Sequence, residues 1–377
     1  MTATHADVPR LIANPLRNAA RLTRIGRPSA AFHRSLPGYA PTPLRSAPAA
    51  AAALGVARVL VKDESERLGM PSFKILGASW AAYRVLLRHV GLDLAAHPDL
   101  ERLRDELRRF PGLSLTAATD GNHGRAVARM GALLGLPVHI FVPDDMVAAR
   151  IAAIEGEGAS VEVVDGGYDD AIRRSADAVD ARTLVVSDTS WEGYTEPPAW
   201  VIEGYSTLIG EIADAIADGT IAAPTVVAAQ IGVGAFAAAV ARGFGGSAGT
   251  RVVGVEPVDA DCTTVSIERG VPTTIPGPQR SIMAGLNCGT PSLVAWPDVS
   301  SGFDAFCTVT DAAAEQAMRL LHRDGIVSGE SGAAGLAGML VHRDALGLSA
   351  SDTVLVFSTE GATDVVAYNR ICETELS

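Results

Sequence analysis

The heptapeptide Ser72-Phe73-Lys74-Ile75-Leu76-Gly77-Ala78 places one lysine between an aromatic and two aliphatic residues. It follows a polar approach, Lys62-Asp63-Glu64-Ser65, and stands where the sequence turns to a helical spacing of apolar residues. Burial disfavours a charged ammonium group, so such a lysine can lose its proton near neutral pH and attack an aldehyde. A lysine whose alkyl stem lies on apolar surface while its ammonium reaches water explains the heptapeptide equally well. The rest of the chain must decide between the two interpretations.

Strands alternate with helices along most of the chain. Strands are expected at 56–62, 113–118, 138–142, 160–164, 183–187, 225–230, 251–256 and 353–358. Helices are expected at 77–90, 93–110, 125–134, 148–156, 168–181, 200–217, 233–244, 311–323 and from 364 onward. This alternation predicts an α/β fold with mainly parallel, twisted sheets covered by helices on both faces. The segment 270–299 is rich in proline and reads as loop, and 325–338 is rich in glycine.

Composition excludes several classes of protein. The 377 residues are 48% hydrophobic and 20% charged, an ordinary globular balance in a chain long enough for two domains. The net charge is −12 without a basic tract, which argues against binding to nucleic acid or to an anionic membrane. Residues 1–27 lack the continuous apolar core of a signal peptide, and no segment is apolar enough to span a bilayer. The four cysteines lack metal-ligand spacing, so we expect no metal site and a cytoplasmic protein.

Four short segments stand at the carboxyl ends of expected strands, where open α/β sheets bind ligands. The first contains Lys74. The second is the turn 119–124, which holds Asp120, Asn122 and His123. Ordinary turn chemistry explains these residues as well as a site does. The apolar strand before them argues that their side chains project from a sheet edge, and we assign His123 no chemistry.

The third segment, Gly232-Val233-Gly234-Ala235-Phe236-Ala237, follows a strand and opens a helix. Small residues let backbone amides approach an anion, and the helix N-terminus adds a favourable dipole. The segment lacks the third glycine of a dinucleotide fingerprint and the lysine of a P-loop, so it fits a monophosphate. The fourth segment, 358–361, offers the hydroxyl groups of Ser358 and Thr359, which suit a ring nitrogen or, equally, a helix cap.

Together the four segments supply an amine for an aldehyde, a cradle for a phosphate and polar groups for a ring. Pyridoxal 5'-phosphate carries all three groups and is the usual aldehyde cofactor of amino-acid chemistry. Lys62-Asp63-Glu64, the heptapeptide 72–78 and Gly121-Asn122-His123-Gly124 also resemble, in order and spacing, the motifs of tryptophan-synthase-like (fold type II) pyridoxal-phosphate enzymes.

Further blocks resemble one family within that group, diaminopropionate ammonia-lyase. They are 119–124, Asp188-Thr189-Ser190-Trp191-Glu192-Gly193-Tyr194, 282–289, 327–333 and 358–361. The resemblance runs from about Tyr39 to the C-terminus, and its Trp-Glu-Gly-Tyr and Met-Ala-Gly-Leu blocks are far more specific than the lysine motif. It implies β-elimination of 2,3-diaminopropionate to pyruvate and ammonia.

The resemblance also implies roles around the cofactor. Lys74 would hold pyridoxal phosphate as a Schiff base, and Gly232 to Phe236 would bind its phosphate. Asn122 would contact the phenolic oxygen, and Ser358 or Thr359 would contact the ring nitrogen.

Two carboxylates complete the implied site. Asp120 and Asp188 would act on the substrate side, which suits a diamino acid because its second ammonium group needs an anionic partner. A turn closing the strand 183–187 is an alternative explanation of Asp188.

The implied architecture is that of tryptophan synthase β. A large cofactor-binding domain would comprise 1–83 and 190–377, and a smaller, mobile α/β domain would comprise 84–189. We expect a homodimer that acts on a small amino acid.

Other activities stay open: β-replacement, in which a nucleophile traps the product of elimination, dehydration of serine or threonine, and cofactor binding without catalysis. The chain departs from the family at Phe236 (usually methionine), Ala238 (usually glycine) and Ala362 (usually aspartate). Backbone amides hold the phosphate, so the first two changes should leave its binding intact, whereas the change at Ala362 bears on the substrate. Cys262 and Cys288 stand in matching family blocks, which allows a disulfide, although two reduced, packed thiols are favoured.

Overall fold

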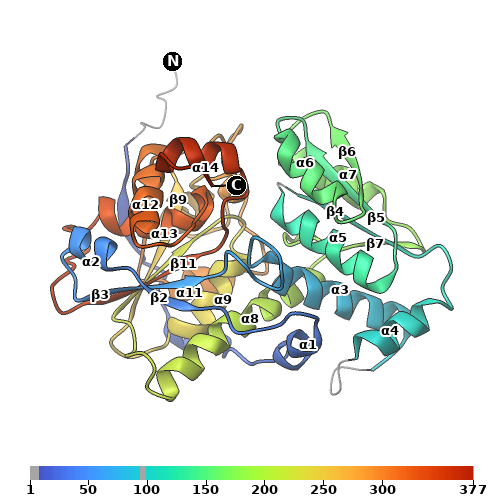
Figure 1. Cartoon of the computed structure of the whole chain (residues 1–377), viewed down its shortest axis with the longest axis horizontal. Helices are drawn as coiled ribbons and strands as arrows, with labels where there is room; N and C mark the ends of the chain where they lie inside the picture. Colours follow the sequence, from blue (N-terminus) through green and yellow to red (C-terminus); the bar gives the residue numbers. More distant parts are fainter. Residues whose placement is uncertain (1–7, 94–98, 120, 377) are drawn as a thin grey trace. The chain divides into compact units, whose positions relative to one another are not determined.

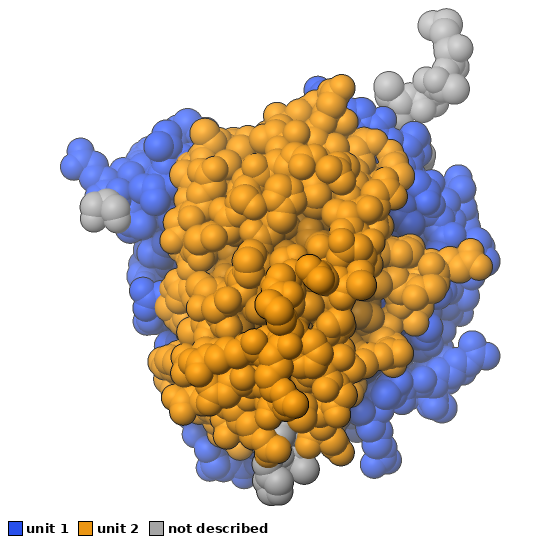
Figure 2. All heavy atoms as spheres, turned by 90° about the vertical axis from the view of Figure 1, so that its right-hand side faces the viewer, with its two compact units in different colours: residues 1–25, 42–66, 208–377 blue, residues 26–41, 67–207 orange. Residues whose placement is uncertain are grey.

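The computed structural model describes residues 8–93, 99–119 and 121–376, which form two compact units (Figure 1). Unit 1 comprises residues 1–25, 42–66 and 208–377, and unit 2 comprises residues 26–41 and 67–207. Figure 2 colours unit 1 blue and unit 2 orange. The domain boundaries expected from the sequence, and the mobility of the smaller domain, stay predictions.

Unit 1 is built on a seven-stranded sheet whose strands follow the order β1-β10-β9-β8-β11-β3-β2. These are β1 (Leu11–Ala13), β10 (Ala305–Val309), β9 (Arg251–Pro257), β8 (Val226–Gln230), β11 (Thr353–Ser358), β3 (Arg58–Asp63) and β2 (Leu44–Ser46). The five inner strands pair in parallel, and the edge strands β1 and β2 pair antiparallel with β10 and β3.

Unit 2 contains a four-stranded, wholly parallel sheet. Its order is β6 (Ser160–Val164), β5 (Val138–Pro143), β4 (Ser114–Ala118) and β7 (Thr183–Val185). The expected α/β class with mainly parallel sheets is confirmed.

Helices connect and cover the strands. In chain order they are α1 (Ala30–Ser35), α2 (Pro48–Leu54), α3 (Lys74–Val90), α4 (Leu100–Leu107), α5 (Asn122–Leu134), α6 (Ala148–Glu155), α7 (Tyr168–Asp177), α8 (Glu196–Ala217), α9 (Ala235–Phe244), α10 (Cys262–Arg269), α11 (Trp296–Gly302), α12 (Asp311–Arg323), α13 (Glu330–Val341) and α14 (Val365–Cys372). Two short 3₁₀ helices lie at Ala19–Arg21 and Ala284–Leu286. Among the described residues no helix is both long and apolar enough to cross a membrane.

The glycine-rich segment 325–338 mostly forms the buried helix α13, which packs on β8, β9, β10 and β11. Its glycines permit that close packing. A Cβ atom added to Gly338 would lie 2.6 Å from the Val255 side chain, and one added to Gly335 would lie 3.3 Å from the carbonyl oxygen of Ala228. Small residues on α13 therefore let its backbone approach the sheet. The spacing of hydrophobic residues alone does not predict so close an approach.

Candidate active site

Lys74 is the first residue of α3, three residues before the start expected from the sequence. Close packing between α3 and α8 fixes its position. A Cβ atom on Gly77 would lie 2.7 Å from both Tyr205 and Val201, and one on Gly204 would lie 2.4 Å from the carbonyl oxygen of Leu76. The glycine of the heptapeptide is thus required because two helices meet at that residue.

The structure brings Lys74 and Asp188 together. Nζ of Lys74 lies 2.7 Å from Oδ2 of Asp188, and the two side chains are 16% and 5% exposed. Oδ1 of Asp188 accepts a hydrogen bond of 3.2 Å from the hydroxyl of Tyr168, the first residue of α7. Burial opposes ionisation of Asp188, but the neighbouring charge of Lys74 and the hydrogen bonds from Lys74 and Tyr168 hold the pKa of Asp188 well below its usual range. The carboxylate in turn favours the ammonium form of Lys74, against the neutral amine that its apolar neighbours in sequence suggest.

The Trp-Glu-Gly-Tyr block clamps the backbone just before Asp188. The rings of Trp191 and Tyr194 stack with centroids 4.1 Å apart, and their backbones exchange two hydrogen bonds. The hydroxyl of Tyr194 donates to the carbonyl oxygen of Val185 and accepts from the amide of Ser187, both at 3.0 Å. Burial raises the pKa of Tyr194, so the phenol keeps the proton that this clamp needs. The block recognised in the sequence as a family marker therefore has a structural task.

The Gly-Asn-His-Gly block forms the start of α5. Oγ1 of Thr119 accepts hydrogen bonds of 2.9 Å from the amides of Gly121 and Gly124. A Cβ atom on Gly124 would lie 2.4 Å from the Thr119 side chain, so this position requires glycine. Asn122 is the half-buried first residue of the helix. Asp120, the other predicted catalytic carboxylate, lies outside the described residues.

His123 and Tyr168 complete the surroundings of Asp188, and the sequence assigned chemistry to neither. Nδ1 of His123 lies 3.9 Å from Oδ2 of Asp188, and its Nε2 lies 2.8 Å from the carbonyl oxygen of Val186. His123 is part of the Gly-Asn-His-Gly block, so the sequence did contain an indication that this residue belongs to the site. Tyr168 stands at the start of a solvated helix, and nothing near it in the sequence indicates a contact with Asp188.

The predicted phosphate segment lies in unit 1 between β8 and α9. Gly234 has φ +103°, a left-handed conformation that favours glycine. The first backbone hydrogen bond of α9 runs from Ala238 N to Gly234 O at 2.8 Å, so the amides before Ala238 belong to the helix N-terminus. Donors of this kind at a helix N-terminus suit a phosphate group.

The predicted phosphate segment also packs against the Met-Ala-Gly-Leu block. A Cβ atom on Gly232 would lie 2.9 Å from the carbonyl oxygen of Gly285 and 3.4 Å from Sγ of Cys288. The amide of Gly285 donates to the hydroxyl of Ser331 at 3.1 Å, which ties this block to the start of α13. Two blocks that are distant in sequence thus support this loop, one directly and the other through Gly285.

The two hydroxyl groups after β11 differ in their partners. Ser358 is fully buried and its hydroxyl donates to Oγ of Ser328 at 2.8 Å. Oγ1 of Thr359 instead accepts a hydrogen bond of 2.8 Å from Nε2 of Gln230. The hydroxyl proton of Thr359 is therefore the one available to a ring nitrogen.

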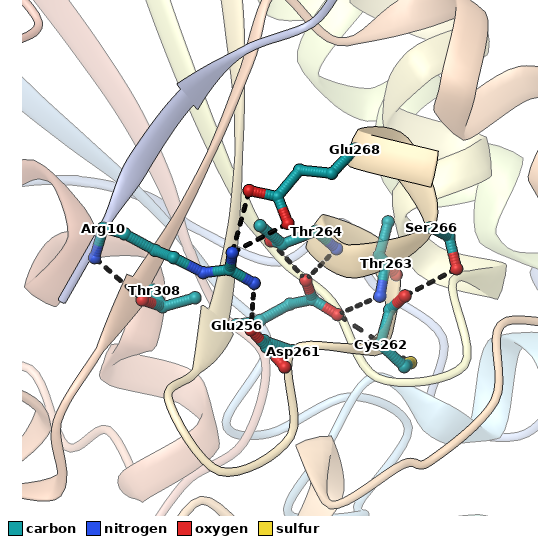
Figure 3. Close-up of polar contacts among 9 residues, drawn as sticks. All are labelled: Arg10, Glu256, Asp261, Cys262, Thr263, Thr264, Ser266, Glu268 and Thr308. Carbon is teal, nitrogen blue, oxygen red and sulfur yellow. Dashed lines mark hydrogen bonds and ion pairs between the residues drawn. The ribbon is translucent and has the colours of Figure 1, made fainter. Parts of the chain in front are cut away.

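Another buried carboxylate, Glu256, lies near the end of β9 (Figure 3). Its oxygens accept hydrogen bonds from the amides of Thr263 and Thr264 at 2.9 and 2.7 Å, and from the hydroxyl of Thr264 at 2.7 Å. Glu256 thereby satisfies the N-terminus of α10, while Arg10 binds Asp261 and Glu268 beside it. Burial raises the pKa of Glu256 to about 7.

All four cysteines are free and buried. Sγ of Cys262 lies 3.9 Å from Oε1 of Glu256. Burial raises the pKa of Cys262 well above its usual value, and the neighbouring charge of Glu256 adds to the shift. Cys262 and Cys288 are thus two reduced thiols here, the state that the sequence favoured.

Comparison with known proteins defines the class of this chain. The family described as pyridoxal-phosphate dependent enzyme matches residues 36–360. The chain therefore belongs to the pyridoxal-phosphate dependent enzymes, and its fold class is that of the fold type II enzymes it matches. A curated diaminopropionate ammonia-lyase of Escherichia coli (strain K12) is 37% identical over 368 residues, covering 90% of this chain and 89% of that protein.

Solved structures agree with the sequence comparison. Diaminopropionate ammonia lyase from Escherichia coli in complex with D-serine matches with a TM-score of 0.89 and 33% identity over 97% of each chain. The same enzyme in complex with an aminoacrylate-PLP azomethine reaction intermediate matches with a TM-score of 0.85 and 32% identity, again over 97% of each chain. This chain is a member of the diaminopropionate ammonia-lyase family.

Proposed function

We propose that this enzyme eliminates the β-amino group of 2,3-diaminopropionate, giving pyruvate and two molecules of ammonia. The observation that carries the proposal is the 2.7 Å contact between Lys74 and the buried carboxylate of Asp188. A substrate with two amino groups suits such a site because its β-ammonium needs an anion. The related enzyme of known structure holds an aminoacrylate-PLP azomethine intermediate, which supports elimination as the reaction of the family.

The residues present fit pyridoxal phosphate. Lys74 is the amine that would hold its aldehyde, and the glycine-lined segment 232–236 would hold its phosphate through backbone amides. Asn122 would contact the phenolic oxygen. When bound, the cofactor supplies an electron sink for the electrons of the substrate Cα–H bond.

Thr359, rather than Ser358, would donate to the ring nitrogen. The hydroxyl of Ser358 already donates to Ser328, whereas the oxygen of Thr359 accepts from Gln230 and leaves its proton for another acceptor. A neutral hydroxyl at this position would leave the ring nitrogen unprotonated.

The chain's own groups would then move the protons. Lys74 or Asp120 would remove the proton from the substrate α-carbon as a general base. Asp188 would bind the β-ammonium and, because its pKa is held low, would stay ionised while it does so. The β-amino group is a good leaving group only in its protonated form. A stable anion beside it therefore both binds the substrate and keeps the departing nitrogen charged.

The deciding experiment measures product release from both enantiomers of 2,3-diaminopropionate, with serine and threonine as alternatives. An assay for 2-oxo acids reports pyruvate, or the 2-oxobutyrate that threonine would give, and a separate assay reports ammonia. We expect pyruvate with twice as much ammonia from at least one enantiomer of diaminopropionate, and slower release from serine and threonine. Release from serine or threonine alone would overturn the proposal and favour a dehydratase.

Adding a nucleophile tests the alternative of β-replacement. If thiols or amines lower the yield of pyruvate while substrate consumption continues, the enzyme is a transferase. We expect the yield to stay unchanged.

The expected homodimer and cytoplasmic location belong to the same proposal. The four free cysteines suit a reducing compartment. Sedimentation equilibrium of the purified chain and fractionation of the source cells test the two expectations.

A further inference from the structure

His123 carries a buried ring nitrogen that the proposed roles leave unused. Its Nε2 lies 2.8 Å from the carbonyl oxygen of Val186, and a carbonyl only accepts, so Nε2 bears a hydrogen. Its Nδ1 makes no hydrogen bond within the part of the chain that the structure describes, and the residue is 1% exposed. The second nitrogen of this imidazole is therefore open to a proton.

Oδ2 of Asp188 lies near two nitrogen atoms that can hold a proton. Nζ of Lys74 is 2.7 Å away, and Nδ1 of His123 is 3.9 Å away. The second distance exceeds a normal N–H···O bond by about 1 Å, which a small side-chain movement covers. Among the described residues, the hydroxyls of Tyr168 and Tyr194 are further titratable groups near Asp188. The first donates to Oδ1 of Asp188, and the second is committed to Val185.

Lys74 must lose a proton before it can attack an aldehyde, and its ion pair opposes that loss. A carboxylate beside the ammonium stabilises the charged form, and Asp188 itself is a poor final acceptor because it remains ionised. Imidazole, in contrast, is the side chain that most often accepts protons near neutral pH.

We propose that His123 is a positioning residue that accepts the proton of Lys74 through Asp188. An N–H bond of Lys74 breaks, Oδ2 of Asp188 passes the proton on, and a new N–H bond forms at Nδ1 of His123. Lys74 becomes a neutral amine with a free electron pair, and Asp188 ends ionised beside an imidazolium. The buried carboxylate thus always has a cation next to it, first Lys74 and then His123. The inference rests on the proposed function in that Lys74 is taken to hold the cofactor.

Loading of the cofactor tests this relay without any turnover. The full chain, freed of cofactor, is mixed with pyridoxal phosphate between pH 6.5 and 9.5, and the visible absorbance of the lysine-bound form is followed with time. His123→Gln keeps an amide donor for Val186 but removes the second acceptor. We expect loading at pH 7 to slow by about tenfold or more, and the difference to shrink towards alkaline pH, where lysine loses its proton to water.

A matched control is His342→Gln. His342 is also buried, and its Nε2 also lies near a backbone carbonyl oxygen, that of Thr308 at 3.0 Å. It belongs to the other unit, so we expect unchanged loading at every pH. A His123→Gln chain that loads at the normal rate at pH 7, or one that is slowed equally at every pH, would overturn the relay.

The wild-type profile gives an independent measurement should the His123 variant fail to fold, which far-UV circular dichroism reports. With the relay, loading reaches its plateau near neutral pH. A rate that instead keeps rising with hydroxide up to pH 9.5 would show that Lys74 loses its proton directly to water.

The relay and the proposed function can fail separately. A chain that loads as expected yet releases no pyruvate from either enantiomer of diaminopropionate would sink the function and leave the relay. Normal pyruvate release, together with cofactor loading that His123→Gln leaves unchanged, would overturn the relay and leave the function.

Discussion

Asp188 owes its properties to a small number of neighbours. It is buried, yet it stays ionised because Lys74 forms an ion pair with it and Tyr168 donates a hydrogen bond to it. Taking a charge out of water costs several kcal/mol, so each cation lost from beside a buried carboxylate should be felt as a loss of stability. The ion pair with Lys74 therefore has a structural consequence that can be measured apart from catalysis.

Lys74→Met should lower the stability of the cofactor-free chain by about 2 kcal/mol, because it leaves Asp188 buried without its main partner. The additional change Asp188→Asn should recover most of that loss, since no unpaired charge is then left. Urea unfolding at pH 7 measures both variants, and far-UV circular dichroism of each folded chain is the control. Equal instability of the single and the double variant would contradict this account of the pair.

The two hydroxyl groups after β11 allow a second test at single residues. Thr359→Val removes the hydroxyl whose proton is available, and we expect it to weaken cofactor binding about tenfold, the worth of one hydrogen bond. Ser358→Ala removes a hydroxyl already committed to Ser328 and should leave that affinity within about threefold. Equilibrium dialysis with pyridoxal phosphate gives both dissociation constants, and the reverse order would assign the ring nitrogen to Ser358.

At the scale of secondary structure, α3 shows how the heptapeptide works. Residues 77–90 have helical spacing, and the helix forms there, but it begins at Lys74 because the tertiary contact with α8 extends it. The strand 353–358 and the helix 311–323 coincide with their expected bounds, since buried parallel strands and amphipathic helices leave strong patterns. The edge strands β1 and β2 are three residues long, too short for any periodicity, and were not expected.

Gly77→Ala should destabilise the protein although alanine favours helices. The gain in helix propensity is about 1 kcal/mol, but the added methyl group would overlap Tyr205 and Val201, each 2.7 Å away. Overpacking of this kind costs about 1–3 kcal/mol, so we expect a net loss of stability and slower capture of the cofactor by Lys74. Gly246→Ala is the control, because its added Cβ atom would meet nothing within 4 Å. Thermal unfolding compares the two, and equal midpoints would show that α3 and α8 separate easily.

Across the whole molecule, the sequence predicted the fold class and the cofactor, whereas the roles of individual site residues stay predictions. Lys74 and the phosphate segment were recognisable as residue types at strand ends, and the roles of Asp120 and Asp188 came from the resemblance to a family. What local pattern does not contain is the pairing of Lys74 with Asp188, 114 residues apart. The pairing follows from the tertiary packing of α3 on α5, of α5 on β4 and of β4 beside β7 in unit 2. His123 was set aside for the same reason, because its role depends on a carbonyl oxygen and a carboxylate contributed by another strand end.

The protonation of Glu256 affects the stability of the whole chain. Its pKa is raised from the ordinary value of 4.5 to about 7 in the folded protein, because burial outweighs the hydrogen bonds from Thr263 and Thr264. A group whose pKa is raised by folding contributes stability that is complete below its unfolded pKa and is lost as pH rises through its folded pKa. The stability of the wild type relative to Glu256→Gln should therefore fall by about 2–3 kcal/mol between pH 5 and 8.5.

Urea unfolding of both chains at half-unit steps of pH measures that difference. Glu268→Gln is the matched control, because Glu268 also binds near the start of α10, through Arg10, but its side chain is 41% exposed, so its removal should give no such trend. A difference that stays constant with pH would mean that the amides of Thr263 and Thr264 keep Glu256 ionised throughout. In that case the carboxylate would serve as a permanently charged cap for α10. The hydrogen bonds, rather than burial, would then determine the pKa of Glu256.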